Sequence, residues 1–382
     1  MTNRRAPKGL MGKFIRPWAP LILIVITACS SNSIRGNLVS RGPSSVPEKV
    51  IVDSDGAVFW DDGAAIAMLL QHPEKIKILG ISMVLGNHWP YQGAEYIARV
   101  LEVAGRTDVP IYIGADHPLN NSKEKMVRLE EDLINQGVVD KSGFWKGAYS
   151  RSKEVRSVAD VEPARGEPLS GITPMTKSAV EFIIDTLNGS TEPVTFVAIG
   201  PLTNLAQAIQ KDRSIVSKIR RLVFMGGNIH VKGNTTPFAE LNFLFDPEAA
   251  QIVISSGIVE KLMFPLDFCN QALITQDRYR ELTLAEAPYA ALLKADRGPK
   301  FKDSSYSVAS WDTTVSAFLI DPSYVTGSED LSLKVVEEFG PRYGSVQITS
   351  EKMNTVRVMS QMNFEKFFSI LRADLTSSPK GR

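Results

Sequence analysis

Four aspartates stand close together after a short apolar run. The stretch reads VIVDSDGAVFWDD from residue 50 to residue 62, and its carboxylates belong to Asp53, Asp55, Asp61 and Asp62. Like charges this close repel one another unless a cation, a shared proton or solvent separates them. Helix-capping aspartates in a solvated loop would account for Asp61 and Asp62, but not for Asp53 and Asp55 at the end of a buried strand.

Several carboxylates gathered with backbone carbonyls suit a hard cation that prefers oxygen ligands. No histidine or cysteine occurs in this stretch, so Ca²⁺ fits the residue types better than Zn²⁺. A haloacid-dehalogenase-type phosphatase is a competing hypothesis, because DSDGAV also resembles its Asp-x-Asp-Gly start. Asp53 would then be the nucleophile and Asp55 the general acid, with Mg²⁺ as the metal. That hypothesis leaves the Asp61–Asp62 pair without a role.

Alternating strand and helix patterns surround the aspartates and must position them. Short apolar runs predict strands, and apolar residues at helical spacing predict the helices between them. The predicted strands cover residues 50–55, 76–87, 109–115, 194–200, 219–228 and 261–267. The predicted helices cover residues 61–72, 93–106, 123–137, 176–187, 202–210, 246–257 and 363–375. This alternation indicates an α/β fold, with an open, mostly parallel (mixed) sheet and helices on both faces.

Polar side chains and glycines cluster where several of these strands end. They are Asp53, Asp55, Asn87, the Gly200-Pro201 turn and the Gly226-Gly227-Asn228 turn. Ligands bind outside the carboxyl ends of the strands in open α/β sheets. Separate segments of the chain therefore point to one site.

The size and charge of the chain limit the classes of protein that it can be. It has 382 residues, 43% of them hydrophobic, and a formal net charge of +1. That length allows a large core, and that charge creates no global field that would attract nucleic acid. We expect one catalytic domain over residues 49–375, with 118–175 as an irregular, mobile cover and 376–382 as a tail.

The N-terminal residues predict export and a lipid anchor. A basic region precedes the stretch WAPLILIVITAC, which is short for a bilayer span and resembles the core of a signal peptide. Small residues before Cys29 resemble a bacterial lipoprotein signal, in which residues 1–28 are removed and the cysteine is lipidated. Residues 29–48 then form a Ser-rich tether on a periplasm-facing protein, and Ser30 favours the outer membrane. An uncleaved anchor helix is the alternative.

The segment DSDGAVFWDDGAAIAML resembles the signature of the inosine–uridine-preferring nucleoside hydrolases, in which Asp-x-Asp and a turn precede Asp-Asp at a helix start. Further segments are similar to the family in the same order: GISMVLGN, VLEVAGRTDVPIYIGADHPL, VTFVAIGPLTNLAQAI, RLVFMGGN, GNTTPFAELNFLFDPEAAQIVISSG and WDTTVSAFLIDPSYV. The resemblance covers residues 49–372. It implies a Rossmann-like nucleoside hydrolase fold, a ribonucleoside substrate, Ca²⁺ as cofactor and a homodimer or homotetramer.

The resemblance also implies a role for each matching residue. Asp55, Asp62, Asp312 and the backbone carbonyl of Ile199 would bind Ca²⁺, with Asp53 supporting them. Asp61 would be the general base that activates a Ca²⁺-bound water, and the N-glycosidic bond would break through an oxocarbenium-like state. The matches that would line the pocket or hold the ribose are Asn87, Met225, Asn234, Glu240 and Asn242.

Two departures from the family pattern bear on substrate and turnover. The turn after Asp55 is longer than the commonest version, and apolar residues 58–60 fill it. Trp311 stands where many members have a histidine assigned to leaving-group protonation, whereas purine-preferring members have a tryptophan that stacks on the base. Trp311 therefore favours purine nucleosides, with a packing tryptophan as the alternative. Trp145 or Trp60 could supply a second stacking face.

The histidines offer no clear substitute for the missing catalytic acid. His88 and His230 follow strand-end motifs and could approach the pocket, while His72 and His117 precede prolines and are expected in loops. A plain surface histidine is the expectation for all four.

Two function hypotheses from different classes stand beside the phosphatase. The first is a Ca²⁺-dependent hydrolase that releases free base and ribose from nucleosides, preferentially purine nucleosides. The second is a catalytically inactive, lipid-anchored ribonucleoside-binding protein that keeps the pocket and has lost turnover. Release of free base distinguishes the two.

Overall fold

The computed structural model describes residues 46–164, 168–350 and 354–380 of the chain. The predicted signal peptide, Cys29 and most of the predicted tether lie outside these described residues. In the described part of the chain, no helix has the length and apolar character needed to cross a membrane.

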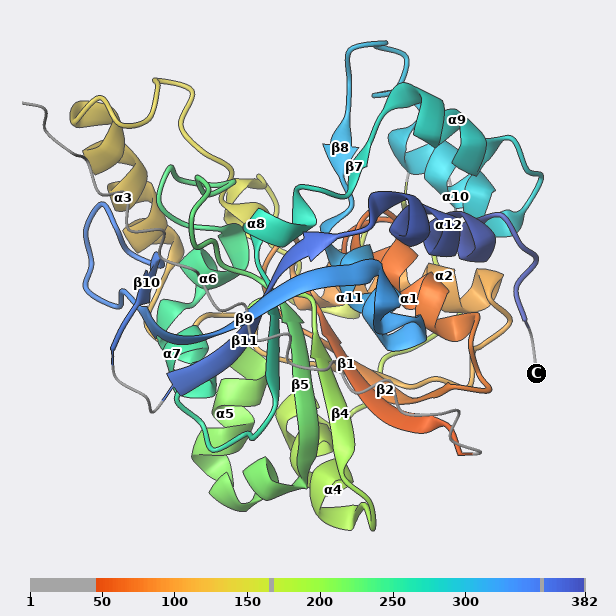
Figure 1. The fold of residues 1–382 in the computed structure, drawn as a ribbon, viewed down its shortest axis with the longest axis horizontal. Coiled ribbons are helices and arrows are strands. Elements are labelled where there is room, and N and C mark those ends of the chain that lie inside the picture. The colour runs from red at the N-terminus through yellow and green to blue at the C-terminus, as the bar shows by residue number, and fades with distance from the viewer. Residues whose placement is uncertain (1–45, 165–167, 351–353, 381–382) are drawn as a thin grey trace, which may run out of the picture. The chain divides into compact units, whose positions relative to one another are not determined.

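A nine-stranded sheet runs through the described fold in the order β10-β9-β11-β6-β5-β4-β1-β2-β3 (Figure 1). Its strands are β1 (Glu48–Ser54), β2 (Ile76–Met83), β3 (Ile111–Ile113), β4 (Val194–Ala198), β5 (Ile219–Met225), β6 (Lys261–Phe264), β9 (Val325–Val335), β10 (Val346–Ile348) and β11 (Thr355–Met362). The pairs from β11 to β3 are parallel, whereas β9 is antiparallel to both of its neighbours. The predicted open, mostly parallel mixed sheet is confirmed.

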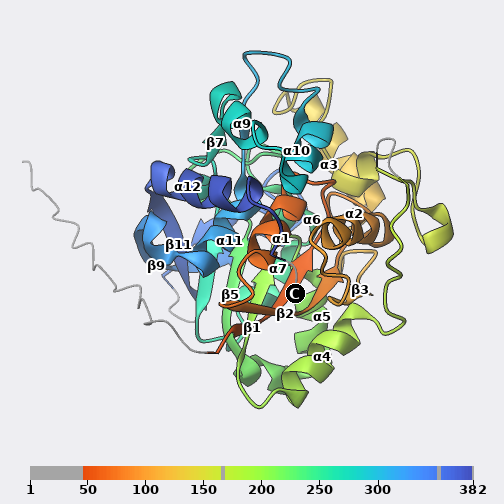
Figure 2. The same cartoon turned by 90° about the vertical axis from the view of Figure 1, so that its right-hand side faces the viewer.

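Helices connect the strands and cover both faces of this sheet (Figures 1 and 2). They are α1 (Asp62–Leu70), α2 (Pro90–Val103), α3 (Lys123–Asn135), α4 (Ala179–Gly189), α5 (Thr203–Lys211), α6 (Leu241–Phe245), α7 (Pro247–Ile254), α8 (Leu266–Cys269), α9 (Gln276–Thr283), α10 (Pro288–Arg297), α11 (Trp311–Ile320) and α12 (Phe364–Leu375). The short 3-10 helices are η1 (Gly147–Ser150), η2 (Val158–Asp160), η3 (Arg213–Lys218) and η4 (Pro322–Tyr324).

The apolar run in β1 follows from burial on both faces of the sheet. Val50 and Val52 belong to a core that includes α1, α2, α11 and α12, whereas Ile51 belongs to the core under α4, α5 and α7. Successive strand residues point to opposite faces, so a strand covered on both sides needs a continuous apolar run. The run therefore places β1 inside the sheet, between β2 and β4.

The predicted cover, residues 118–175, holds regular structure and a core of its own. It contains α3 and the 3-10 helices η1 and η2. Met126 and Leu133 of α3 pack with Tyr149, and with Leu244 of α6, in a third buried apolar cluster. This packing fixes the inner side of the segment against the residues around α6.

The region between β6 and α12 holds elements that the sequence patterns did not predict. Helices α9 and α10 pack together beside a small antiparallel pair, β7 (Leu273–Ile274) and β8 (Val308–Ala309). Strands β11, β9 and β10 then extend the sheet beyond β6, with β9 antiparallel to the other two.

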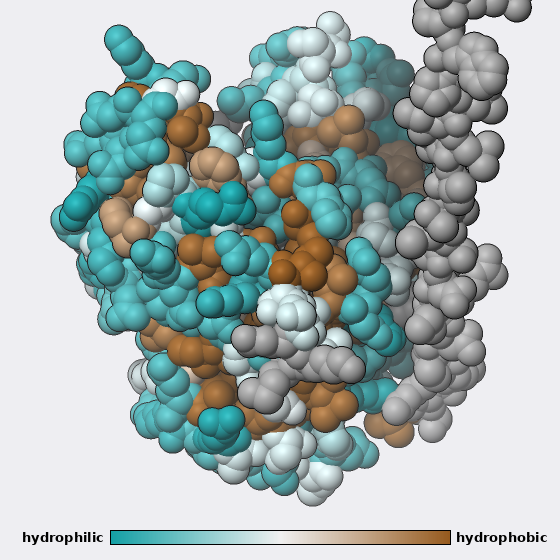
Figure 3. All heavy atoms as spheres, turned by 60° about the vertical axis from the view of Figure 1, so that its left-hand side comes forward, coloured by the Kyte–Doolittle hydropathy of each residue, from teal (hydrophilic) through white to brown (hydrophobic). Residues whose placement is uncertain are grey.

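The surface in Figure 3 mixes hydrophilic residues with small groups of apolar ones. The most exposed large apolar side chains in the described ranges are Val259 (95% exposed), between α7 and β6, and Leu284 (80% exposed), at the end of α9. Singly exposed apolar residues are normal on a protein surface, so these two mark no binding face.

Candidate active site

The turn between β1 and α1 brings the four aspartates to the carboxyl edge of the sheet. Gly56 starts this turn with φ +67°, a backbone conformation that favours glycine. A Cβ atom at Gly56 would lie 2.4 Å from the Cα atom of Gly93 in α2. The turn therefore packs directly on the α2 backbone.

Asp55 and Asp62 lie side by side beneath this turn, and both are buried. Asp62 accepts hydrogen bonds from Ser54 Oγ at 2.6 Å, from the Gly56 amide at 3.1 Å and from the Ala57 amide at 3.0 Å. Asp55 Oδ2 accepts from the backbone N–H of Asn87 at 2.7 Å. These bonds fix both carboxylates while leaving lone pairs for a further ligand.

Asp61 reaches across to a distant part of the chain. Its carboxylate accepts from the backbone amides of Trp311 at 3.0 Å and Asp312 at 3.1 Å, at the start of α11. A helix N-terminus presents unpaired amides and attracts negative charge. The contact brings Asp312 to the carboxylates that follow β1.

Burial raises the pKa of every carboxyl group in this cluster, and repulsion between carboxylates adds to the rise at Asp55, Asp61 and Asp312. Burial, then the charge of Asp62, raises the pKa of Asp61 to about 8. The same two causes hold the pKa of Asp55 well above its usual range, and burial also raises the pKa of Asp62. Burial and the charge of Asp61 raise the pKa of Asp312 strongly. The cluster is therefore unfavourable as a set of bare anions.

Asp53 is fully buried and does not face the cavity. Its Oδ1 accepts from Ser82 Oγ and, at 2.8 Å, from Asn204 Nδ2. Its Oδ2 is buried without a hydrogen-bond partner among the described residues, and burial raises the pKa of Asp53 to about 7.

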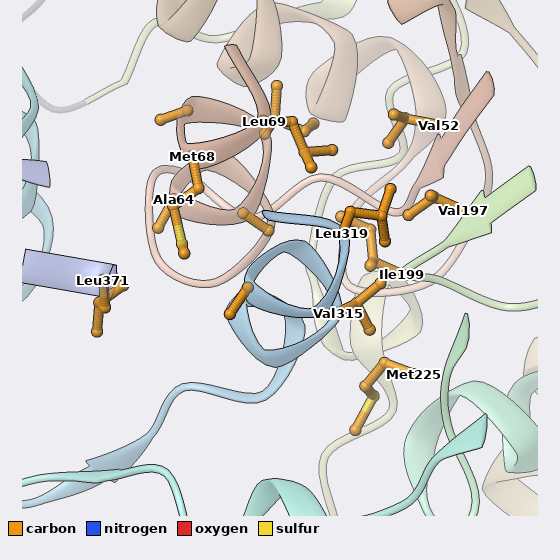
Figure 4. Close-up of a cluster of buried hydrophobic side chains, with 14 of the residues drawn as sticks. Val52, Ala64, Met68, Leu69, Val197, Ile199, Met225, Val315, Leu319 and Leu371 are labelled. Atoms are coloured by element: carbon orange, nitrogen blue, oxygen red, sulfur yellow. The ribbon is translucent and has the colours of Figure 1, made fainter. Parts of the chain in front are cut away.

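A cavity of about 590 Å³ opens over the aspartates. Nine of the residues predicted for the site line it: Asp61, Asn87, Ile199, Met225, Asn234, Glu240, Asn242, Trp311 and Asp312. Asp53, Asp55 and Asp62 do not line it, because they lie in the layer beneath. Figure 4 shows Ile199 and Met225 in the same apolar cluster as Val315 of α11. The cavity floor therefore rests directly on the core.

The residues matched to ribose binding form one wall of the cavity. Glu240 accepts from the amides of Gly227 and Asn242, both at 2.8 Å, and burial raises its pKa to about 7. Asn242 donates to the carbonyl of Met225 at 3.3 Å. The Gly-Gly turn after β5 and the start of α6 are thus held together by the side chains that face the cavity.

Two tryptophans present usable faces at the cavity, and a third does not. Trp311 is half-buried, and its Nε1 donates to Asn270 Oδ1 at 2.9 Å. Trp145 is 45% exposed, and its Nε1 lies 3.4 Å from Asn87 Oδ1. Trp60 is only 2% exposed, and its indole donates to the carbonyl of Ala309 in the core. Trp145 is therefore the better candidate for a second stacking face.

The expectation that His88 is a surface residue is wrong. Its ring is buried, lines the cavity and packs edge-on against Tyr96 with ring centroids 4.9 Å apart. Burial, then the nearby charge of Arg151, lowers the pKa of His88 to about 3, so it is neutral at physiological pH. His117 and His230 are exposed, as expected.

Several cavity residues escaped the sequence analysis. Arg151 comes from the cover segment, Tyr96 from α2, and Asp296 and Arg297 from the end of α10. Asp296 accepts from the Trp60 amide at 3.0 Å, and Arg297 donates to the Trp60 carbonyl at 3.1 Å. No motif marked these residues, because their segments resemble ordinary charged helix or loop sequence.

The donor atoms at the site fit a hard cation. They are carboxylate and carbonyl oxygens from Asp55, Asp62, Asp312 and Ile199, which are the ligands that Ca²⁺ prefers. A cation would relieve the repulsion that raises the pKa values of these groups. Across the described ranges, no three acidic, histidine or cysteine side chains already meet as a closed ligand set.

Comparisons with known proteins bear on this site. Residues 50–369 match the family described as inosine-uridine preferring nucleoside hydrolase. The chain belongs to this family. The predicted resemblance is thus confirmed, and with it the class of enzyme: the family hydrolyses ribonucleosides and generally uses a divalent metal ion.

Relatives of the chain differ in their named substrates. The pyrimidine-specific ribonucleoside hydrolase RihB of Escherichia coli K12 is 31% identical over 304 residues, which cover 78% of this chain and 85% of that protein. The plant nucleoside hydrolase PpNRh1 superposes with a TM-score of 0.70 at 24% identity, over 87% of this chain and 100% of that one. An inosine-guanosine nucleoside hydrolase superposes with a TM-score of 0.71 at 22% identity, over 87% and 99%. At these identities the two structures establish the nucleoside hydrolase fold.

Proposed function

We propose that this chain hydrolyses the N-glycosidic bond of ribonucleosides with Ca²⁺ held by Asp55, Asp62, Asp312 and the Ile199 carbonyl. The supporting observation is the crowding of buried carboxylates with raised pKa values at the cavity wall and in the layer beneath it. When bound, the cation lowers the pKa of a water molecule and orients ribose hydroxyl groups.

The residues of the chain divide the remaining work. Asp61 faces the cavity, held by two backbone amides, and accepts the proton of the attacking water. Glu240 and Asn242 line the wall beside Met225 and bind the ribose hydroxyls. Asn87 donates to Asp55 and holds that carboxylate in place. Asp53 supports the same carboxylates from the layer below.

Purine nucleosides are the proposed substrates. Trp311 and Trp145 both line the cavity, and two indole faces suit a large bicyclic base.

Pyrimidine nucleosides are the second candidate, because RihB is 31% identical and is named as pyrimidine-specific. The relative rates of purine and pyrimidine release distinguish the two candidates, because an active site that relies on stacking favours the larger base.

Cys29 is proposed as the site of a lipid anchor that holds the enzyme at the membrane. Substitution Cys29→Ala is expected to move the protein from the membrane fraction to the soluble fraction. Retention of the variant in the membrane fraction would indicate an uncleaved helix instead. The proposed assembly is a homodimer or a homotetramer, and the mass of the purified protein in detergent distinguishes the two.

Base release by the purified chain tests the proposal. Inosine, guanosine, adenosine, uridine and cytidine are offered with Ca²⁺ and then with chelator. Chelator-sensitive release of hypoxanthine and guanine is the expected result, and faster release of uracil would favour the pyrimidine candidate. A chain that releases no base, while a ribonucleoside still raises its melting temperature, is a binding protein, and the role given to Asp61 is then wrong.

A further inference from the structure

The departing base needs an electrophile that the cavity must supply. Breaking the bond between C1′ and the base nitrogen leaves an electron pair on the base, so negative charge develops there. Trp311 carries no acidic proton suited to that charge. Among the described residues, His88 is the one histidine that lines the cavity.

His88 cannot act as the acid through its Nε2 atom. That atom lies 2.9 Å from Nη2 of Arg151. A guanidinium donates and never accepts, so Nε2 must be the acceptor and the imidazole is neutral, with its proton on Nδ1. Nδ1 is buried and has no partner among the described residues. His88 therefore holds Arg151 in place.

Arg151 is fixed on three sides. Besides the bond to His88, its Nε donates to the carbonyl of Asn87 at 3.3 Å. Its guanidinium carbon lies 5.4 Å from the ring centroid of Trp145, over the indole face. These contacts occupy two of the five N–H groups, which leaves the others available to a molecule in the cavity.

Among the residues that the structure describes, Arg151 has no carboxylate partner, whereas two nearby arginines, Arg156 and Arg297, each form ion pairs. No carboxylate lies within ion-pair distance of it in the described ranges. Arg156, from the same segment, pairs with Asp116 at 2.7 Å and Glu154 at 3.2 Å, and Arg297 pairs with Asp296 at 3.3 Å. A half-buried arginine that lines a cavity without a counter-charge suits a ligand that brings or develops negative charge.

The position of Arg151 places it beside the base. Asn87 joins the two halves of the cavity, because its amide donates to Asp55 while its side chain and carbonyl face Trp145 and Arg151. A base in this part of the cavity would lie next to the guanidinium, which covers one face of the Trp145 indole.

We propose that Arg151 is a catalytic residue that contacts the leaving base and stabilises its developing negative charge, in place of a histidine acid. This inference rests on the proposed hydrolase function. The electron pair of the C1′–N bond goes to the base nitrogen, and the water oxygen bonds to C1′. The water proton goes to Asp61, and the released base takes a proton from solvent.

The experiment compares two substrates whose leaving groups differ in how much stabilisation of negative charge they require. Inosine has a poor leaving group, whereas p-nitrophenyl ribofuranoside releases a stable phenolate without protonation. In the full-length chain, Arg151→Met is expected to lower kcat/KM for inosine by roughly 100-fold but for the phenyl riboside by less than about threefold. Arg151→Lys, which keeps the charge without the fork, should recover part of the inosine rate. Arg156→Met is the matched control and should change neither rate.

An equal loss on both substrates would overturn the inference, because Arg151 would then act only by holding Asn87 and the cavity wall. Equal melting temperatures of wild type and variants would show that folding is unchanged. A wild-type chain that cleaves neither substrate refutes the proposed function itself, which is a different outcome from an equal loss in the variant.

Discussion

At the scale of single residues, the proposed mechanism assigns metal binding and proton transfer to two adjacent aspartates. Asp62 lies in the buried layer and Asp61 faces the cavity. We expect Asp61→Asn to lower kcat by roughly 10²–10⁴-fold, since it removes the general base. The rise in melting temperature on adding Ca²⁺ should survive in that variant. In Asp62→Asn the same rise should disappear, because a ligand oxygen is lost.

Calorimetry with and without Ca²⁺ checks both halves of this prediction. Loss of the calcium effect in Asp61→Asn, with its retention in Asp62→Asn, would reverse the assignment of the two residues.

Asp246 carries a prediction about pH and stability. It caps α7 and accepts from Ala249, Leu119 and Thr203, and burial raises its pKa from 3.8 to about 6. The folded chain then keeps a proton that the unfolded chain loses, so this contribution to stability is full below pH 4 and is lost as pH rises to 6.

The variant Asp246→Asn removes this titration. Relative to wild type, its free energy of unfolding should improve by roughly 2 kcal/mol between pH 4 and pH 6, whatever its constant cost in lost hydrogen bonds. Urea unfolding at a series of pH values, with Ca²⁺ in excess, measures the difference. A pH-independent difference would show that Asp246 has an ordinary pKa.

At the scale of elements, the close contact between the β1–α1 turn and α2 can be tested by adding one side-chain carbon to it. Gly56 and Gly105 have nearly the same φ, +67° and +65°, but a Cβ at Gly105 would meet nothing within 4 Å. Gly56→Ala should therefore destabilise the chain by roughly 1–3 kcal/mol more than Gly105→Ala, because only the first overpacks against Gly93. Denaturant unfolding of both variants tests this, and equal losses would contradict the close packing.

Helix α10 positions the turn that carries Asp61. The Asp296 side chain accepts from the backbone amide of Trp60, and the Arg297 side chain donates to the carbonyl of the same residue. Asp296→Ala should lower kcat by roughly tenfold to a hundredfold through misplacement of Asp61, with a small change in melting temperature. Asp277→Ala, which removes an exposed partner of Arg280 on α9, is the control. An unchanged kcat in Asp296→Ala would show that the turn is fixed without α10.

The parallel half of the fold was predictable because its strands are buried on both faces. The apolar runs of β1, β4 and β5 and the spacing of α5 and α7 are strong local signals. Strands β9 and β10 carry no such signal. Most residues of β9 are partly or fully exposed, without regular alternation, and many of them are polar. Helix α9, QDRYRELT, buries only Leu282 and Thr283, so its pattern resembles a polar loop.

The same contrast applies to the site. Strand-end motifs located the acidic residues after β1 and Asn87, because the carboxyl ends of parallel strands meet at one edge. Glu240 and Asn242 were predicted only through the family resemblance. Arg151 and Tyr96 reach the cavity only through the packing of the cover segment and α2, which no local pattern encodes. Burial of His88 depends in the same way on contacts with Tyr96 and Arg151.

At the scale of the whole molecule, metal binding and folding should be linked. A ligand that binds only the folded chain adds about 2.7 kcal/mol of stability at a concentration of 100 Kd. Saturating Ca²⁺ should therefore raise the melting temperature, and chelator should lower it to that of the metal-free protein. A melting temperature unaffected by Ca²⁺ and chelator would argue against a metal site at the aspartates.

The bond from Asp61 to the start of α11 has a consequence for how the protein is made. The two amides that hold Asp61 lie 250 and 251 residues later in the chain. A ribosome that delivers the chain from its N-terminus exposes the aspartates long before those amides exist. The acidic edge thus stays open during most of synthesis, and the nascent chain cannot become active until nearly all of it has emerged.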